Sequence, residues 1–264
     1  MNSILFQIWD TARNRMRAMF KWHKQAVNTI AFSPDGRSIV SGSDDYSVRI
    51  SNIRDGLSKR LPVTGSTLDF FLSVVFSPDG RYIAAGDTKK LLWVWHSRTH
   101  RLVANWMSHS DSVWCVEFTP DGKGLVSGSR DATAIYWDVS SLEIHEAASG
   151  RDVFPPGHSF PSIRSFSGHT VRFCFHFIAC SLLSYSHPQG VVRSVAFFPS
   201  HSEWVITSSD DGSARVWDMR TGDWQLVIRG HGKSVMEVAT NGTENFLASA
   251  STDRYVTLWR YEML

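Results

Sequence analysis

Histidine is the residue type in this chain with the widest range of possible chemistry, because its imidazole binds metals and transfers protons near neutral pH. The chain has 264 residues and eleven histidines. A metal site needs ligands at close spacing, such as His-x-x-x-His with a nearby carboxylate. Among the histidines outside a repeat described below, none shows this spacing together with a nearby carboxylate, since His96 and His100 are four residues apart but have no acid near them in the sequence. We therefore expect no metal and no cofactor. The histidines outside the repeat are His96, His100, His145, His158, His176, His187 and His201.

Glycine-rich turns and nucleophile motifs give no stronger case for catalysis. The stretches SGSDD at 41–45 and SGSRD at 127–131 are rich in small residues. No helical pattern follows either of them, so no helix N-terminus is available to hold a phosphate. No Ser or Cys nucleophile motif occurs either. The sequence therefore favours a protein that is not an enzyme and has no small-molecule substrate.

Four further histidines recur within an internal repeat of about 43 residues. Each copy has short apolar stretches separated by turn residues, as in AFSPDGRSIVSGSDDYSVRI at 31–50, and a fourth strand-like stretch is expected after each copy. Gly-His or a similar pair opens the unit and Trp-Asp often closes it. The copies begin at Ala31, Val75, Glu117, Ala196 and Val238.

Four short strands every ~40–45 residues with these markers resemble the blade of a WD-repeat β-propeller. The resemblance implies an all-β fold in one domain over 1–264, an incomplete propeller of five full blades plus the last strands of another. The expected boundaries are 4–21 for the remnant and 23–63, 66–107, 109–167, 168–229 and 230–261 for the blades.

In this family a His, a strand Ser or Thr, a turn Asp and the Trp form a buried hydrogen-bonded tetrad. The first unit has Ser51 in place of Trp, and the second has Ser66, Ala85 and Lys89, retaining only Trp95. We expect the walls of these two blades to rest on strand pairing and apolar burial alone. Three units have complete tetrads: His109, Ser127, Asp131 and Trp137; His169, Thr207, Asp211 and Trp217; His231, Ser249, Asp253 and Trp259.

Two segments interrupt the repeat. The proline-rich stretch 145–161 is expected to form a long loop between blades. Removing residues 171–189 restores both the 43-residue step and the four-residue distance from His to the first strand valine. We interpret this block either as a translated intron without evolved function or as a hydrophobic inserted loop. Sequencing the spliced transcript distinguishes the two.

Bulk properties exclude several classes of partner and location. The formal charge of +2 is too small to imply a nucleic-acid partner, and we interpret the basic run from Arg13 to Lys24 as a solvated strand face. Three cysteines suit a reducing compartment. No signal peptide is readable, and the apolar run 173–183 is too short to cross a membrane.

The first residues read as the end of a blade. Residues 4–10 have the pattern of a third strand, and the next stretch supplies a fourth. In principle, residues 15–21 could pair with residues 255–261 and close a five-bladed ring. We expect instead a shortened chain or an open, unstable arc.

The second, third and last units are similar to the C-terminal propeller of fungal Tup/Groucho-type transcriptional co-repressors. That resemblance implies a nuclear scaffold that binds DNA-bound regulators through protein or peptide contacts. The family's N-terminal oligomerising helix has no counterpart in the sequence, which puts autonomous repression in doubt. Two alternatives stay open: a cytoplasmic WD-repeat adaptor of another pathway, and a non-functional or truncated fragment.

Propellers of this type bind partners on the face formed by the loops that enter the first strand of each blade. We expect two positions per blade on this face: the residue after the strand valine, and the residue before the turn Asp. Trp114 is the strongest candidate anchor, because aromatic residues dominate binding hot spots. The predicted partner-binding residues are Asn28, Leu72, Trp114, Arg193, Met236, Asp44, Thr88, Arg130, Asp210 and Thr252.

Overall fold

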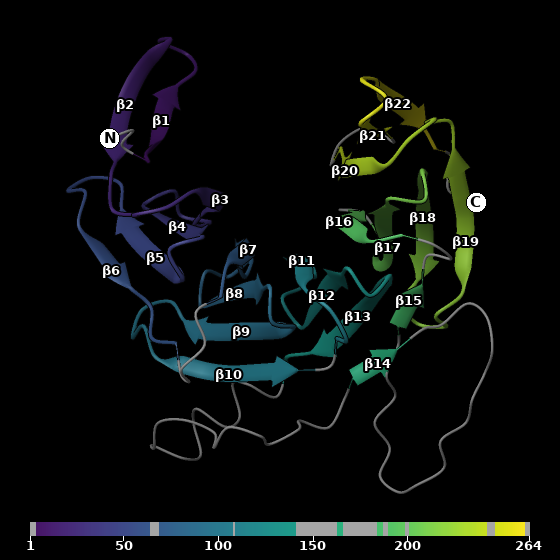
Figure 1. Ribbon diagram of the computed structural model, residues 1–264, viewed down its shortest axis with the longest axis horizontal. Coiled ribbons are helices and arrows are strands. Elements are labelled where there is room, and N and C mark those ends of the chain that lie inside the picture. The colour runs from purple at the N-terminus through teal and green to yellow at the C-terminus, as the bar shows by residue number, and fades with distance from the viewer. Residues whose placement is uncertain are drawn as a thin grey trace, which may run out of the picture.

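The computed structural model describes residues 4–63, 69–107, 109–140, 163–165, 184–186, 190–198, 201–241 and 246–261. Within these ranges the regular structure is entirely β, arranged in six antiparallel sheets that follow chain order. The sheets stand side by side around an open arc, with their first strands nearest the centre (Figure 1). The expected all-β, incomplete propeller is therefore confirmed.

The strands divide into a hairpin and five blades. The hairpin comprises β1 (Phe6–Asp10) and β2 (Arg15–Phe20). Blade 1 has β3 (Val27–Phe32), β4 (Ser38–Ser43), β5 (Ser47–Asn52) and β6 (Ser58–Arg60); blade 2 has β7 (Phe71–Phe76), β8 (Tyr82–Asp87), β9 (Leu91–His96) and β10 (Leu102–Met107). Blade 3 has β11 (Val113–Phe118), β12 (Gly124–Ser129) and β13 (Thr133–Asp138); blade 4 has β16 (Val192–Phe198), β17 (His201–Ser209), β18 (Ser213–Asp218) and β19 (Trp224–Arg229); blade 5 has β20 (Val235–Thr240), β21 (Phe246–Ser251) and β22 (Val256–Arg260).

Two short strands share the outer edge of blade 3. β14 (Ile163–Ser165) pairs with residues 135–137 of β13, and β15 (Ser184–Ser186) pairs with residues 133–134. Residues 184–186 belong to the block 171–189, so this part of the block takes part in a sheet. The rest of that block, and the expected loop 145–161, lie outside the described residues.

Turn chemistry explains where the first hairpin of each blade reverses. In the Pro-Asp-Gly turns the glycine adopts a positive φ, 65° at Gly36 and 74° at Gly80, which glycine reaches without a steric penalty. The Asp35 carboxylate accepts hydrogen bonds from the Ser33 hydroxyl and the Arg37 amide. These local bonds fix the hairpin and therefore the register of the strands beside it.

The hydrophobic core lies between neighbouring sheets. In the described part of the chain, one cluster of buried side chains fills each of the five junctions from the hairpin to blade 5. Trp93 and Trp95 stack at the junction of blades 1 and 2, and Trp106 of blade 2 stacks on Trp137 of blade 3. Several of the many tryptophans of the sequence therefore pack at the junctions between adjacent blades and stabilise them.

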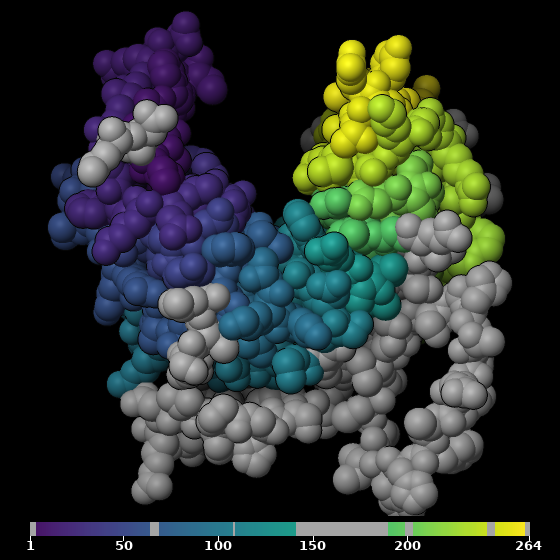
Figure 2. Space-filling model, viewed as in Figure 1, coloured from purple at the N-terminus to yellow at the C-terminus, as the bar shows by residue number. Residues whose placement is uncertain are grey.

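The two ends of the arc expose the kind of surface that every inner junction buries. On β18 of blade 4, Ala214 and Val216 are 2% and 3% exposed beneath blade 5. The equivalent β22 residues of blade 5, Val256 and Leu258, are 70% and 71% exposed. The space-filling view shows the purple hairpin and the yellow last blade standing apart (Figure 2).

The alternative closure of a five-bladed ring is not formed. β2 pairs with β1, and among the described strands β22 pairs only with β21. β2 belongs to a two-stranded sheet with β1 and does not pair with β22, so its backbone does not complete blade 5. The structure has the open arc that the sequence favours.

Candidate functional site

Complete hydrogen-bonded tetrads occur in blades 3 and 5. In blade 3, His109 Nδ1 lies 3.0 Å from Asp131 and His109 Nε2 lies 2.8 Å from the Ser127 hydroxyl, which also accepts a bond from Trp137 Nε1. In blade 5, His231, Asp253, Ser249 and Trp259 repeat this chain, with distances from 2.7 to 2.9 Å. Each tetrad ties the loop before the first strand to the turn between the second and third strands.

Blade 4 shows the described part of a third tetrad. Trp217 Nε1 donates to the Thr207 hydroxyl at 2.8 Å. Asp211 accepts bonds from the Ser213 amide and hydroxyl, and its carboxylate also lies 3.4 Å from Arg215. His169 lies outside the described residues, so its place in this tetrad stays a prediction.

Blade 1 keeps more of the tetrad than expected. His23 bonds to Asp45 at 2.9 Å and to Ser41 at 2.7 Å. Ser51, which replaces the Trp, is buried and its hydroxyl has no hydrogen-bond partner. The expectation that only strand pairing and apolar burial support this wall is therefore wrong, because loss of the Trp leaves the other three members connected.

Blade 2 replaces the tetrad with a different polar network. Asp87, fully buried, accepts a bond of 2.7 Å from Trp93 Nε1 and bonds from the backbone amides of Lys89 and Leu91. Trp95 Nε1 donates to the Pro62 carbonyl instead of to a hydroxyl. The expectation of a purely apolar wall is wrong here as well.

Asp87 lies two residues before the expected turn acid, at the place where the other blades have Ser, and that shift is the sequence signal for it. Ser66 lies outside the described residues.

Electrostatics separate the two kinds of buried acid. Burial alone would raise the pKa of the Asp131 carboxyl, but hydrogen bonds from His109 and Thr133 hold that pKa well below its ordinary value. Burial raises the pKa of Asp87, and the nearby Asp69 charge adds to the effect. The tetrad thus holds a carboxylate firmly ionised, whereas burial and the Asp69 charge in blade 2 outweigh the hydrogen bonds to Asp87 and favour its neutral form more than water does.

One of the two predicted partner-binding positions in each blade, the residue after the first strand residue, coincides with a repeated β-bulge. In every blade the register between the first and second strands shifts at the residue after the first strand residue, as between Val113 and Cys115 of blade 3. A bulge leaves its residue unpaired and redirects its side chain. We name the end of the blades that carries these bulges the loop face. The bulged residues are Asn28, Leu72, Trp114, Arg193 and Met236.

Arg193 connects blades 3 and 4 on the loop face. Its Nε and Nη2 donate to the two carboxylate oxygens of Asp210 at 2.7 and 2.6 Å, and its guanidinium lies 4.5 Å from the centre of the Trp114 ring. The paired guanidinium also holds the pKa of Asp210 below its ordinary value. The indole Nε1 of Trp114 is buried and has no hydrogen-bond partner. The stack is a rigid, amphipathic surface built from three of the predicted residues.

The remaining predicted residues differ in their exposure and in their contacts. Asn28 Nδ2 donates to Asp44 at 2.7 Å and to the Phe71 carbonyl of blade 2. Arg130 is exposed and lies 3.9 Å from Asp111, which is too long for a hydrogen bond. Leu72 and Thr88 are half-buried, Thr252 is exposed, and Met236 is 39% exposed. The loop face therefore presents apolar, aromatic and charged groups together.

The described residues offer little for catalysis. Burial raises the pKa of the Cys115 thiol far above its ordinary value, so this cysteine is protonated and poorly nucleophilic. No group of three or more potential metal ligands occurs in the described ranges. Within the same ranges, no helix has the length and apolar character needed to cross a membrane.

Comparison with known proteins gives a consistent picture. The family described as "WD domain, G-beta repeat" matches residues 14–51, 62–96, 100–138, 179–218 and 222–260. The fourth match begins inside the block 171–189, upstream of the strands of blade 4.

The chain matches only part of the length of each named relative. A "U3 small nucleolar RNA-associated protein 15 homolog" from Xenopus tropicalis is 30% identical over 67% of this chain and 35% of that protein. "Nuclear distribution protein nudF" from Emericella nidulans is 28% identical over 62% of the chain and 38% of that protein. A "Guanine nucleotide-binding protein subunit beta" from Solanum tuberosum is 31% identical over 50% and 37%. The matches thus span little more than a third of these relatives, and none is a co-repressor by name.

Proposed function

Because the chain belongs to the WD-repeat family of G-beta type, we propose that it is a non-catalytic protein–protein interaction scaffold that binds proteins or peptides on its loop face. The observation that carries the proposal is the Trp114–Arg193–Asp210 stack at the β-bulges of blades 3 and 4. Tryptophan and arginine are the residues that most often dominate binding energy at interfaces.

Preorganisation is the physical reason for choosing this stack. Ordering a long, flexible side chain during binding costs about 0.5–1.5 kcal/mol. Asp210 and the Trp114 ring already hold Arg193 in place, so that cost falls on folding instead of binding. Among the described residues, Nη1 of Arg193 has no hydrogen-bond partner. It can therefore donate a hydrogen bond to an acceptor on the bound protein.

The test compares two single tryptophan replacements. Trp114→Ala removes the aromatic ring that stacks with Arg193 on the loop face. Trp224→Ala removes a 55% exposed ring on the outer strand β19. Proteins retained by the wild-type chain and by the Trp224 variant, but lost from the Trp114 variant, are the expected partners. With such a partner in hand, Trp114→Ala is expected to weaken binding by ~2 kcal/mol, about 30-fold. Equal affinity of all three proteins would reject the loop face as the binding surface.

The finer proposal concerns the kind of partner and the compartment. We propose a DNA-bound transcriptional regulator in the nucleus, with no direct contact to nucleic acid; the support is the similarity of the second, third and last units to co-repressor propellers. A cytoplasmic adaptor is the alternative. Imaging of the tagged chain, together with the identity of the proteins that depend on Trp114, separates the two. Retention of RNA by the purified chain would contradict the absence of nucleic-acid contact.

A further inference from the structure

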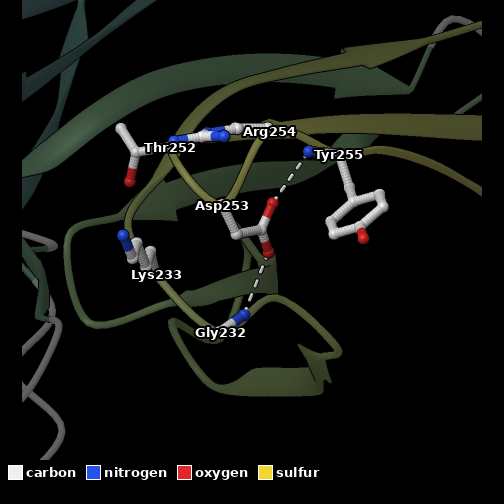
Figure 3. Close-up of a pocket in the computed structure, with 6 residues that line it drawn as sticks. All are labelled: Gly232, Lys233, Thr252, Asp253, Arg254 and Tyr255. Carbon is white, nitrogen blue, oxygen red and sulfur yellow. Dashed lines mark hydrogen bonds between the residues drawn. The ribbon is translucent and has the colours of Figure 1, made fainter.

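Blade 5 has a hollow of about 570 Å³ on the loop face, at the turn between β21 and β22 (Figure 3). Its wall combines the loop before β20 with that turn. In Figure 3 the side chains of Lys233 and Thr252 point to the same side of the turn, and the Arg254 side chain extends above it. The lining residues are Gly232, Lys233, Thr252, Asp253, Arg254 and Tyr255.

The only carboxylate in this wall is already engaged. Asp253 accepts bonds from His231 Nδ1 at 2.9 Å, from the Gly232 amide at 3.0 Å and from the Tyr255 amide at 2.9 Å. These three donors occupy both of its oxygens. Lys233 and Arg254 have no ion-pair partner among the described residues, so two cations face the hollow without a dedicated counter-charge.

The equivalent place in blades 2 and 3 has the opposite charge. There the position of Lys233 is occupied by Asp69 and Asp111. Asp69 lies 3.2 Å from Lys89, and Asp111 lies 3.9 Å from Arg130, so each acid offsets a cation of the neighbouring turn. At the position where blades 2 and 3 have this acid, blade 5 has a second cation, Lys233.

Arg254 occupies an unfavourable backbone conformation. Its φ is 76°, in the left-handed region that residues with a Cβ rarely adopt. Blade 4 has Gly212 at the same turn position, with a φ of 79°. The turn of blade 5 therefore positions a guanidinium at a site where glycine would be the more stable choice.

We propose that this hollow is an anion-binding subsite of the loop face, which receives a carboxylate or phosphate group carried by the bound protein. Lys233 and Arg254 supply charge-assisted hydrogen bonds, and the Thr252 hydroxyl supplies a neutral donor. The inference rests on the proposed function, because it assigns the subsite to the same partner-binding face.

The experiment needs no partner and uses the whole chain. Amide spectra are recorded while sodium phosphate, or in a second series sodium acetate, replaces chloride at constant ionic strength. We expect saturable shifts at the Gly232 and Thr252 amides. A response to phosphate alone identifies a phosphorylated side chain as the natural group, and equal responses to both anions identify a carboxylate. No saturable shift with either anion overturns the proposal.

Variants connect the signal to the two cations. Lys233→Ala with Arg254→Ala is expected to weaken anion binding at least about tenfold, since both charge-assisted hydrogen bonds to the anion are lost. Lys90→Ala is the matched control, because Lys90 occupies the turn position of Arg254 in blade 2 with a φ of 77°. If the alanine variant does not fold, Lys233→Gln with Arg254→Gln replaces it. Unchanged affinity in a folded double variant also overturns the proposal.

The outcome is separable from that of the proposed function. Loss of the anion signal with intact dependence of partner binding on Trp114 rejects the subsite and leaves the scaffold. If the chain binds anions but its binding of partner proteins does not depend on Trp114, the subsite is supported and the loop face is rejected as the binding surface.

Discussion

Individual carboxyl groups differ in the hydrogen bonds that they accept and in the direction in which the fold shifts their pKa. Tetrad acids such as Asp131 receive several hydrogen bonds and stay ionised. Glu117 on β11 receives none from the described residues, and burial together with the Glu237 charge raises its pKa to about 7. A side chain of this kind makes stability depend on pH near neutrality.

Glu117→Gln is expected to stabilise the protein at high pH. A raised pKa in the folded state contributes stability that is complete below about pH 4.5 and is lost as pH rises through 7. Glutamine mimics the neutral form, so the variant avoids that loss. Urea unfolding should show a small difference at pH 5 and a gain of up to about 3 kcal/mol at pH 8. The same difference at both pH values would contradict the raised pKa.

Residue chemistry was only partly predictable from the sequence. The tetrads of blades 3 and 5 follow a fixed spacing, so His109 and His231 could be placed in advance. The acceptor for Trp93 was missed, because Asp87 lies two residues before the expected turn acid and the bond, within one hairpin, does not follow the tetrad spacing. The stacking of Arg193 on Trp114 needs the geometry of two blades, which no single repeat contains.

At the scale of elements, close approach between strands holds neighbouring blades together. Small residues of the second strands allow the first strand of the next blade to lie against them. A Cβ added to Gly86 of β8 would come within 2.5 Å of Val113 Cγ1 and 3.0 Å of the Val113 carbonyl. The backbone itself therefore limits which residues fit at this junction.

Gly86→Ala is expected to lower the free energy of unfolding by about 1–3 kcal/mol, because the strand β11 must shift to admit the methyl group. Gly232→Ala is the matched control, since a Cβ there meets nothing within 4 Å. Thermal or urea unfolding of both variants measures the difference. An unaffected Gly86 variant would show that blades 2 and 3 are packed less closely than the structure has them.

The elements themselves were largely predictable, for local reasons. Pro-Asp-Gly turns and alternating apolar residues place the hairpins of blades 1 to 3, because both signals act within a few residues. The shared edge of β14 and β15 on blade 3 was not predictable, because it joins two segments about twenty residues apart, one of them inside the block that breaks the repeat.

At the scale of the whole molecule, the arc exposes at its ends the surfaces that its junctions bury. β22 presents Val256 and Leu258 outward, and on β3 Ile30 is 46% exposed whereas the equivalent Val74 is 2% exposed. Such faces favour association with other apolar surfaces. The open arc therefore predicts that a mutation at the end and the same mutation at a junction differ in cost.

Val256→Thr and Val216→Thr are the pair that tests this. The exchange adds a hydroxyl at constant shape, which costs about 1–3 kcal/mol when buried without a partner and little when exposed. We expect the Val216 variant to lose that amount and the Val256 variant to unfold like the wild type. Equal destabilisation of both would mean that the last blade is covered in solution.

The proposed scaffold binds its partner on the loop face of the arc, and amide hydrogen exchange of the complex tests this most directly. Binding is predicted to slow exchange at the loop-face turns of blades 3, 4 and 5, around Arg130, Asp210 and Thr252. The Pro-Asp-Gly turns at the opposite end of the blades should exchange as in the free chain. Protection confined to those opposite turns, or to the outer strands, would contradict the account.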